Sequence, residues 1–184
     1  NGALRLNNTG SRNTSVGYNS LTKATNVKEN TAIGWGCLAN ATEGSVNTGV
    51  GDSCLANLST GGYNTAVGNA SLTSVTTGDK NIGIGRSAGN SITTGSNNII
   101  IGNNAHASAV DVSNEIVIGA GANGLGANYA VIGSADVTRV YAAQDAGATL
   151  YAGGLNIGGT AVSSTAAELN YVDGVTSNIQ TQLD

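Results

Sequence analysis

The residue types that catalyse reactions or bind metals are scarce in this chain of 184 residues. It holds one histidine, His106, and two cysteines, Cys37 and Cys54. Nucleophilic catalysis of the Ser/His/Asp or Cys/His type needs a histidine beside the nucleophile, and a structural zinc ion takes four Cys or His ligands. His106 also falls at a repeat position that elsewhere holds leucine. We therefore predict no catalytic residue, no metal site and no cofactor.

The two cysteines stand seventeen residues apart, at equivalent positions of a repeat. Side chains stacked on neighbouring coils come within disulfide reach, but their Cα–Cβ vectors run nearly parallel, which disfavours the disulfide torsion. We predict that Cys37 and Cys54 are buried free thiols that pack as small apolar groups. The pair gives no indication of a cellular compartment.

The eleven acidic residues are scattered. A glycosidase needs two carboxylates about 5 to 10 Å apart in a cleft. Asp111 and Glu115 lie near the last repeat without an evident partner. The remaining acids within the repeats occupy variable polar positions, which favours solvated surface: Glu29, Glu43, Asp52 and Asp79. This distribution predicts a protein that is not an enzyme.

Exposed aromatic residues are the best candidates for recognition, because their rings stack on sugar faces and keep a polar rim. Tyr18 and Trp35 are at equivalent positions one repeat apart, and Tyr63 is at a different polar position. We take these three as candidate receptor or glycan contacts. Isolated surface rings are also common on soluble proteins, so a decorated shaft or a contact with a neighbouring subunit are alternatives.

A seventeen-residue repeat positions all of these side chains. Its landmark is a short apolar strand that ends in glycine and recurs without insertion: 13–17, 30–34, 47–51, 64–68, 81–85, 98–102 and 115–119. Uninterrupted spacing means that each copy fills the same geometric slot, so the copies stack as coils of a solenoid. Seventeen residues are too few for a helix pair, and the leucine-rich pattern is absent. The repeat therefore predicts an all-β parallel β-solenoid.

Equivalent positions of successive repeats, here called columns, show which strand faces are covered. The second and fourth strand columns share one face: Thr14, Thr31, Thr48, Thr65, Ile82, Ile99 and Ile116, with Val16, Ile33, Val50, Val67, Ile84, Ile101 and Ile118. The third column points the opposite way and is small before it becomes large: Ser15, Ala32, Gly49, Ala66, Gly83, Ile100 and Val117. The residues of both faces predict that both are covered, yet the interior of one thin coil covers only one. We therefore predict a homo-oligomer packed along the strands, with small residues allowing close approach and Ile100 and Val117 marking a wider axis.

A second covered stretch follows each landmark glycine. Its clearest column is a leucine ladder that later accommodates His106: Leu21, Leu38, Leu55 and Leu72. We assign Leu38 and Leu55, together with the fourth strand column, Ile100 and Val117, to core and subunit packing. Another column is glycine, where we expect a turn with positive φ: Gly44, Gly61, Gly78 and Gly95.

The chain leaves the repeat after Gly119. Segment 128–133 resembles one last strand, and 137–141 and 150–157 alternate like strands. A capping box at 165–168 predicts a helix, and Val175, Ile179 and Leu183 predict a short coiled-coil seam. The expected organisation is a lead-in segment at 1–12, the solenoid at 13–119, a Gly-rich β connector at 120–164 and a helical stem at 165–184. Without an initiating Met and with a helix running to its last residue, the chain is expected to be a piece of a longer protein.

Composition narrows the partners. The chain has 28 Gly, no Pro, Phe or Met, and 10% charged residues, so stability must come from ladders of small and branched side chains. A net charge of −4 without a basic stripe argues against nucleic acid and anionic membranes. No apolar run approaches the roughly 18 residues that span a bilayer. We predict neither nucleic-acid binding nor membrane insertion.

The coils 30–34 and 64–68, with sequences NTAIG and NTAVG, resemble the left-handed parallel β-roll heads of YadA-type trimeric autotransporter adhesins and repeats of bacteriophage tail fibres. The segment 165–183 is similar to one common in phage tail-fibre proteins. Adhesin-head coils are usually shorter than seventeen residues, so the turns must differ. The resemblance implies a homotrimer in a virion tail fibre or another extracellular appendage. It also implies attachment to a host-cell glycan or protein, here or through another part of the fibre.

The expected function is therefore a non-enzymatic structural and adhesive segment of a trimeric tail fibre. The head of a bacterial trimeric surface adhesin is the main alternative. An ice-binding solenoid is suggested by the threonine column, although its change to Ile82, Ile99 and Ile116 counts against this reading. A capsule-degrading fibre is a further alternative.

Overall fold

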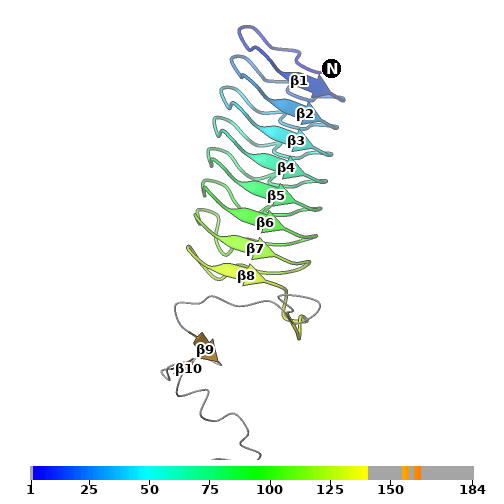
Figure 1. Ribbon diagram of the computed structural model, residues 1–184. Coiled ribbons are helices and arrows are strands. Elements are labelled where there is room, and N and C mark those ends of the chain that lie inside the picture. Colours follow the sequence, from blue (N-terminus) through cyan, green and yellow to red (C-terminus); the bar gives the residue numbers. More distant parts are fainter. Residues whose placement is uncertain (1, 141–154, 158–159, 163–184) are drawn as a thin grey trace, which may run out of the picture. The chain divides into compact units, whose positions relative to one another are not determined.

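The computed structural model describes residues 2–140, 155–157 and 160–162. The chain divides into two compact units, Asn1–Thr138 and Arg139–Asp184. The first contains one parallel sheet of eight three-residue strands in sequence order (Figure 1): β1 Thr14–Val16, β2 Thr31–Ile33, β3 Thr48–Val50, β4 Thr65–Val67, β5 Ile82–Ile84, β6 Ile99–Ile101, β7 Ile116–Ile118 and β8 Ala130–Ile132. In the second, β9 (Leu155–Ile157) pairs antiparallel with β10 (Thr160–Val162).

The register of the sheet confirms the predicted β-solenoid. From β1 to β7, each residue pairs with the residue seventeen positions later, as in Thr31 with Thr48. The last coil is three residues shorter, because Ile116 pairs with Ala130. Strand β8 is the final strand expected within 128–133. The helical stem expected at 165–184 lies outside the described residues.

The strand expected at 137–141 is wrong for its described part, since 137–140 contains no strand. Val137 and Val140 are 48% and 68% exposed. Their spacing of three residues does not follow the two-residue period of a half-buried strand. A three-residue apolar spacing cannot hold both valines on one face of a strand.

The corners of every coil are built from left-handed backbone. Three columns adopt positive φ even where the residue is not glycine, and the columns include Asn19, Leu21 and Glu29 in the first coil, with φ of 57°, 49° and 59°. A left-handed residue costs an L-amino acid roughly 1–2 kcal/mol, so stacking must hold these corners in place. The fixed corner positions explain why the repeat tolerates no insertion between 13 and 119.

The two glycine columns meet different requirements. The landmark glycines combine positive φ with close stacking, as at Gly34, where φ is 136° and a Cβ would overlap the carbonyl of Gly51. The positive φ expected at Gly44, Gly61, Gly78 and Gly95 is wrong, because none of the four adopts it. There a Cβ would overlap the carbonyl oxygen of the coil that follows. Coil stacking, and not turn geometry, therefore requires glycine in this second column.

The third strand column faces the interior of its own coil. Ala32, Ala66, Ile100 and Val117 are all fully buried within the single chain, as are Leu38 and Leu55. The prediction that the small residues allow subunits to approach closely is therefore wrong. So is the interpretation of Ile100 and Val117 as markers of a wider subunit axis. The small residues make room for the neighbouring turn instead: a Cβ on Gly83 would collide with Leu72 and Ser71.

Candidate functional surfaces

The second and fourth strand columns point outward, away from the coil interior. The fourth column forms an apolar ladder along the rod, which we call the strand face: Val16, Ile33, Val50, Val67, Ile84, Ile101, Ile118 and Ile132. Val50 and Ile101 are half-buried, and the other members are exposed, from 37% at Ile118 to 62% at Ile132. Monomeric proteins rarely expose a contiguous apolar surface of this kind.

The second column changes character along the strand face. Thr31, Thr48 and Thr65 lie half-buried beside the fourth column in the first coils, and Ile82 and Ile99 take their place in later coils. The first half of the outward surface thus mixes hydroxyls with branched apolar groups. From β5 to β7 both columns are branched apolar, and in β8 Ala130 stands in the second column.

One corner of the rod carries a stacked aromatic pair. Tyr18 and Trp35 follow the landmark glycines of successive coils, and their ring centroids lie 6.4 Å apart with planes only 12° from parallel. The rings remain 49% and 55% exposed. Tyr63, at 62% exposed, belongs to the column that precedes the strand and so lies at its opposite end. Of the three aromatic candidates, the structure brings together Tyr18 and Trp35 and leaves Tyr63 apart.

The aromatic column continues with polar residues. Asp52 occupies the next coil, and its Oδ1 accepts a 2.7 Å hydrogen bond from the Asn69 side chain one coil further. Arg86 follows in the fifth coil, and all three side chains are exposed. We call the line from Tyr18 to Asn69 the aromatic corner. It combines two ring faces with hydrogen-bonding groups on consecutive coils.

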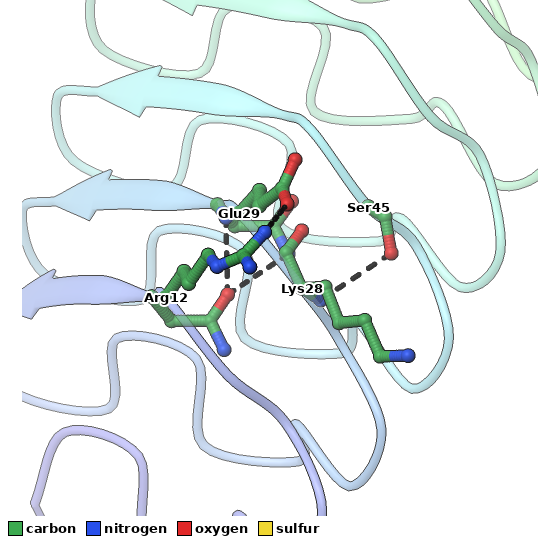
Figure 2. A network of polar contacts seen from close by, with 6 residues as sticks. Arg12, Lys28, Glu29 and Ser45 are labelled. Carbon is green, nitrogen blue, oxygen red and sulfur yellow. Dashed lines mark hydrogen bonds and ion pairs between the residues drawn. The ribbon is translucent and has the colours of Figure 1, made fainter.

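The opposite end of the strand carries an ion pair. Figure 2 shows the Arg12 guanidinium beside the Glu29 carboxylate, 2.6 Å apart on adjacent coils. The Lys28 backbone amide donates to the Ser45 hydroxyl at 3.3 Å in the same network. The side chains of Arg12 and Glu29 are 78% and 45% exposed, so water and salt screen the pair. This surface therefore gives no indication of chemistry.

A buried amide ladder is the largest polar feature that sequence analysis missed. The first residue of the first six landmark segments is asparagine, and its Oδ1 accepts from the backbone N–H and, up to Asn81, from the Nδ2 of the asparagine one coil on. The Asn47 and Asn64 pair shows the geometry, with bonds of 2.9 and 3.1 Å. Each Nδ2 also donates to a carbonyl fourteen residues ahead, as from Asn64 to Gly78 at 2.9 Å. A column of six asparagines beside apolar columns was the available signal.

Glu115 ends the amide ladder. It replaces asparagine in the seventh coil and is fully buried, and its backbone N–H donates to Asn98 Oδ1 at 2.9 Å. Its carboxylate accepts from the backbone N–H groups of Ser108 and Gly126, at 3.0 and 2.8 Å. The shortened last coil presents the backbone N–H of Gly126 where earlier coils present a carbonyl. A two-oxygen acceptor fits that position, so Glu115 has the structural partners that the sequence did not reveal.

The cysteines lie together in the interior. Cys37 and Cys54 are free, fully buried and 2.8 Å apart at sulfur, and Cys54 Sγ lies 3.2 Å from the Gly51 carbonyl oxygen. The hydrogen bond with Cys54, followed by burial, raises the pKa of the Cys37 thiol. That thiol stays protonated at neutral pH and is a poor nucleophile.

The remaining chemical candidates stand alone. His106 is half-buried, and its backbone bridges to the next coil through Ala122 and Gly124. Among the described residues, no group of three or more His, Cys, Asp or Glu side chains is arranged to hold a metal ion. A long apolar helix able to cross a membrane is likewise not found in that part of the chain.

Comparisons of the chain with protein-family models, curated proteins and solved structures give no match.

Proposed function

We propose that this chain is a structural and adhesive segment of a homotrimeric fibre that supports attachment to a host cell. The observation that carries the proposal is the strand face, an apolar ladder that extends along an eight-strand rod and stays exposed in the single chain. Copies arranged around an axis parallel to the rod would bury this ladder along its whole length. Rotational symmetry also closes the assembly, so no exposed apolar surface is left on the strand face to drive aggregation.

The amino-acid pattern of the two outward columns supports self-association. Val16, Ile84 and Ile118 stand at equivalent positions, so every layer of the rod presents a β-branched apolar residue to the same place on a symmetry mate. Their shape is branched and rigid, which suits close packing between sheets. Partners of a different sequence would need a matching repeat, and another copy of this chain has one by definition.

In this role the rod sets the reach of an extracellular appendage, with a virion tail fibre as its location. Attachment is through exposed side chains of this segment or through another part of the fibre. No reaction is assigned to the chain. The head of a bacterial trimeric adhesin uses the same physics, and a membrane anchor in the parent protein would favour it.

Molar mass in solution tests the assembly. We expect about 54 kDa by light scattering, three times the 18.1 kDa of one chain. Ile84→Asp should dissociate the assembly, because it places one carboxylate from each copy on the strand face, which the assembly would bury. Thr60→Asp adds the same charge at an exposed position of a column that already holds Glu43 and should leave the mass unchanged. A single-chain mass for the unsubstituted protein, or an unchanged mass for Ile84→Asp, would reject the assembly.

An ice-binding solenoid is the second candidate, and one observation favours it. Thr31, Thr48 and Thr65 project outward from consecutive strands in parallel register. This candidate needs the same face to be free, so it predicts a single-chain mass together with thermal hysteresis that Thr48→Ala weakens. A trimer without hysteresis would reject it.

A further inference from the structure

The Tyr18 and Trp35 rings leave part of their faces free. Nearly parallel rings whose centroids lie 6.4 Å apart are offset and not eclipsed, so they form a stepped apolar surface. About half of each side chain is accessible to solvent. The coil interior does not need them, since both follow the landmark glycines on the outer corner. The pair is therefore available to a ligand with a flat apolar face.

The neighbours of the rings restrict the ligand. Asp52 lies on the coil after Trp35, and among the described residues only its Oδ1 accepts a side-chain hydrogen bond, from Asn69 at 2.7 Å. Its second oxygen can accept from a hydroxyl or an amide N–H, and charged acceptors form strong hydrogen bonds. A carboxylate beside the rings also repels anionic ligands. This repulsion disfavours nucleic acid, whose bases stack on aromatic side chains but whose phosphates need a basic groove.

We propose that Tyr18, Trp35 and Asp52 bind a neutral, N-acetylated or hydroxyl-rich glycan chain. Sugar rings have one face of C–H groups that packs on an aromatic ring, and their edges carry the donors that Asp52 accepts. Stacked rings on successive coils offer contacts to successive sugars, and Asn69 extends the line. Tyr63 has no part in this site, because it lies at the other end of the strand. The inference rests on the attachment role proposed above, and it does not require a trimer.

The single tryptophan makes the site directly observable. The fluorescence of Trp35 is recorded while the chain is titrated with tetramers of N-acetylglucosamine, glucose and galacturonic acid. We expect a saturable change with at least one of the two neutral tetramers and weaker binding of the anionic galacturonate. No saturable change with either neutral tetramer would overturn the proposal, and so would galacturonate binding as tightly as the neutral chains.

Substitutions separate the site from general stickiness. Tyr18→Ala should weaken binding by about tenfold, since one stacking face is lost. Asp52→Asn keeps the side-chain shape but removes the charge. It should lower the affinity for the neutral tetramer and reduce the difference in affinity between the neutral tetramer and galacturonate. Tyr63→Ala removes a ring that is still more exposed than Tyr18 and should leave binding unchanged. Equal losses in the Tyr18 and Tyr63 variants, or full binding by Tyr18→Ala, would reject the site.

The molar mass of the same samples distinguishes the two proposals. A trimer that binds no neutral tetramer would reject the glycan site and leave the fibre assembly intact. A single chain that binds would reject the assembly and keep the site. Acrylamide quenching of Trp35 in the free protein adds one check, because an indole shielded by another copy would resist quenching and overturn the proposal.

Discussion

In the first four coils a large residue from the turn fills the interior and the strand contributes a small one. In the second coil these are Leu38 from the turn and Ala32 from the strand. In the sixth and seventh coils the strand contributes the large residue, Ile100 or Val117. Gly89 replaces leucine in the turn of the fifth coil, and a Cβ there would lie 3.4 Å from Ile100 Cγ1. The two columns thus exchange volume across the interior. Close packing explains why residue size in one column depends on the column opposite.

The amide ladder runs through both the early and the late coils. Substitutions in it should have the largest effects on the free energy of unfolding. The Asn64 side chain makes four hydrogen bonds within the ladder and to Gly78, whereas that of Asn98 makes three, because Glu115 adds only its backbone N–H. Asn64→Ala should lower the free energy of unfolding by about 3 kcal/mol or more, since buried partners lose their bonds. Asn98→Ala should cost less.

Denaturant unfolding at one fixed protein concentration measures both variants, because assembly couples stability to concentration. Asn57→Ala, at an exposed position, is the control and should stay near the unsubstituted value. A loss at Asn64 no greater than at Asn57 would show that the ladder contributes little.

Two adjacent residues of β6 test the inner and the outer face separately, because Ile100 points into the coil and Ile101 lies on the strand face. Ile100→Ala should lower the free energy of unfolding by about 2–4 kcal/mol, because it leaves a cavity beside Gly89. Ile101→Ala removes the same atoms from the strand face, and its main effect should be a weaker subunit association. Unfolding and light scattering of the two variants measure the contrast. If both variants changed the molar mass equally, the inward and outward assignments of β6 would be wrong.

The sequence was sufficient for the repeat, the strand positions and the eighth strand, because fixed spacing and landmark glycines determine the coil. Alternation along the strand separated two faces but did not identify the inner one. Thr31 and Ile33 are larger than Ala32, yet Ala32 faces inward, because leucines from the turn occupy the interior. The pairing of Tyr18 with Trp35 followed from their shared column. The partners of Glu115 depend on the shortened last coil, which the spacing of 128–133 indicated but whose backbone donors no pattern encodes.

In one corner column, the same left-handed backbone conformation occurs with different residues in an early and a late coil. Val46 has a φ of 60°, which is unfavourable for a β-branched residue, while Asn97 occupies the same column with a φ of 61°. Val46→Asn should raise the free energy of unfolding by about 1 kcal/mol, because asparagine tolerates left-handed backbone. The reciprocal Asn97→Val should lower it by a similar amount. Thermal and denaturant unfolding check both signs, and a destabilised Val46→Asn would contradict the assignment of strain to this corner.

The side-chain contacts at the two ends of this same column should have the smallest effects on stability. The first coils join Arg12 to Glu29 by an exposed ion pair, and the last coils join Asn114 Nδ2 to Asn128 Oδ1 at 2.7 Å. Arg12→Ala should change the free energy of unfolding by less than about 0.5 kcal/mol, and roughly 1 M salt should abolish the difference, because salt screens exposed charges. Asn114→Ala should have a comparably small effect that salt leaves unchanged, since neutral amides carry no net charge. Denaturant unfolding at low and high salt tests the pair of variants. If Arg12→Ala kept its full effect at high salt, the arginine would act through packing of its aliphatic stem on the coil, and the first coils would owe their corner stability to contact instead of charge.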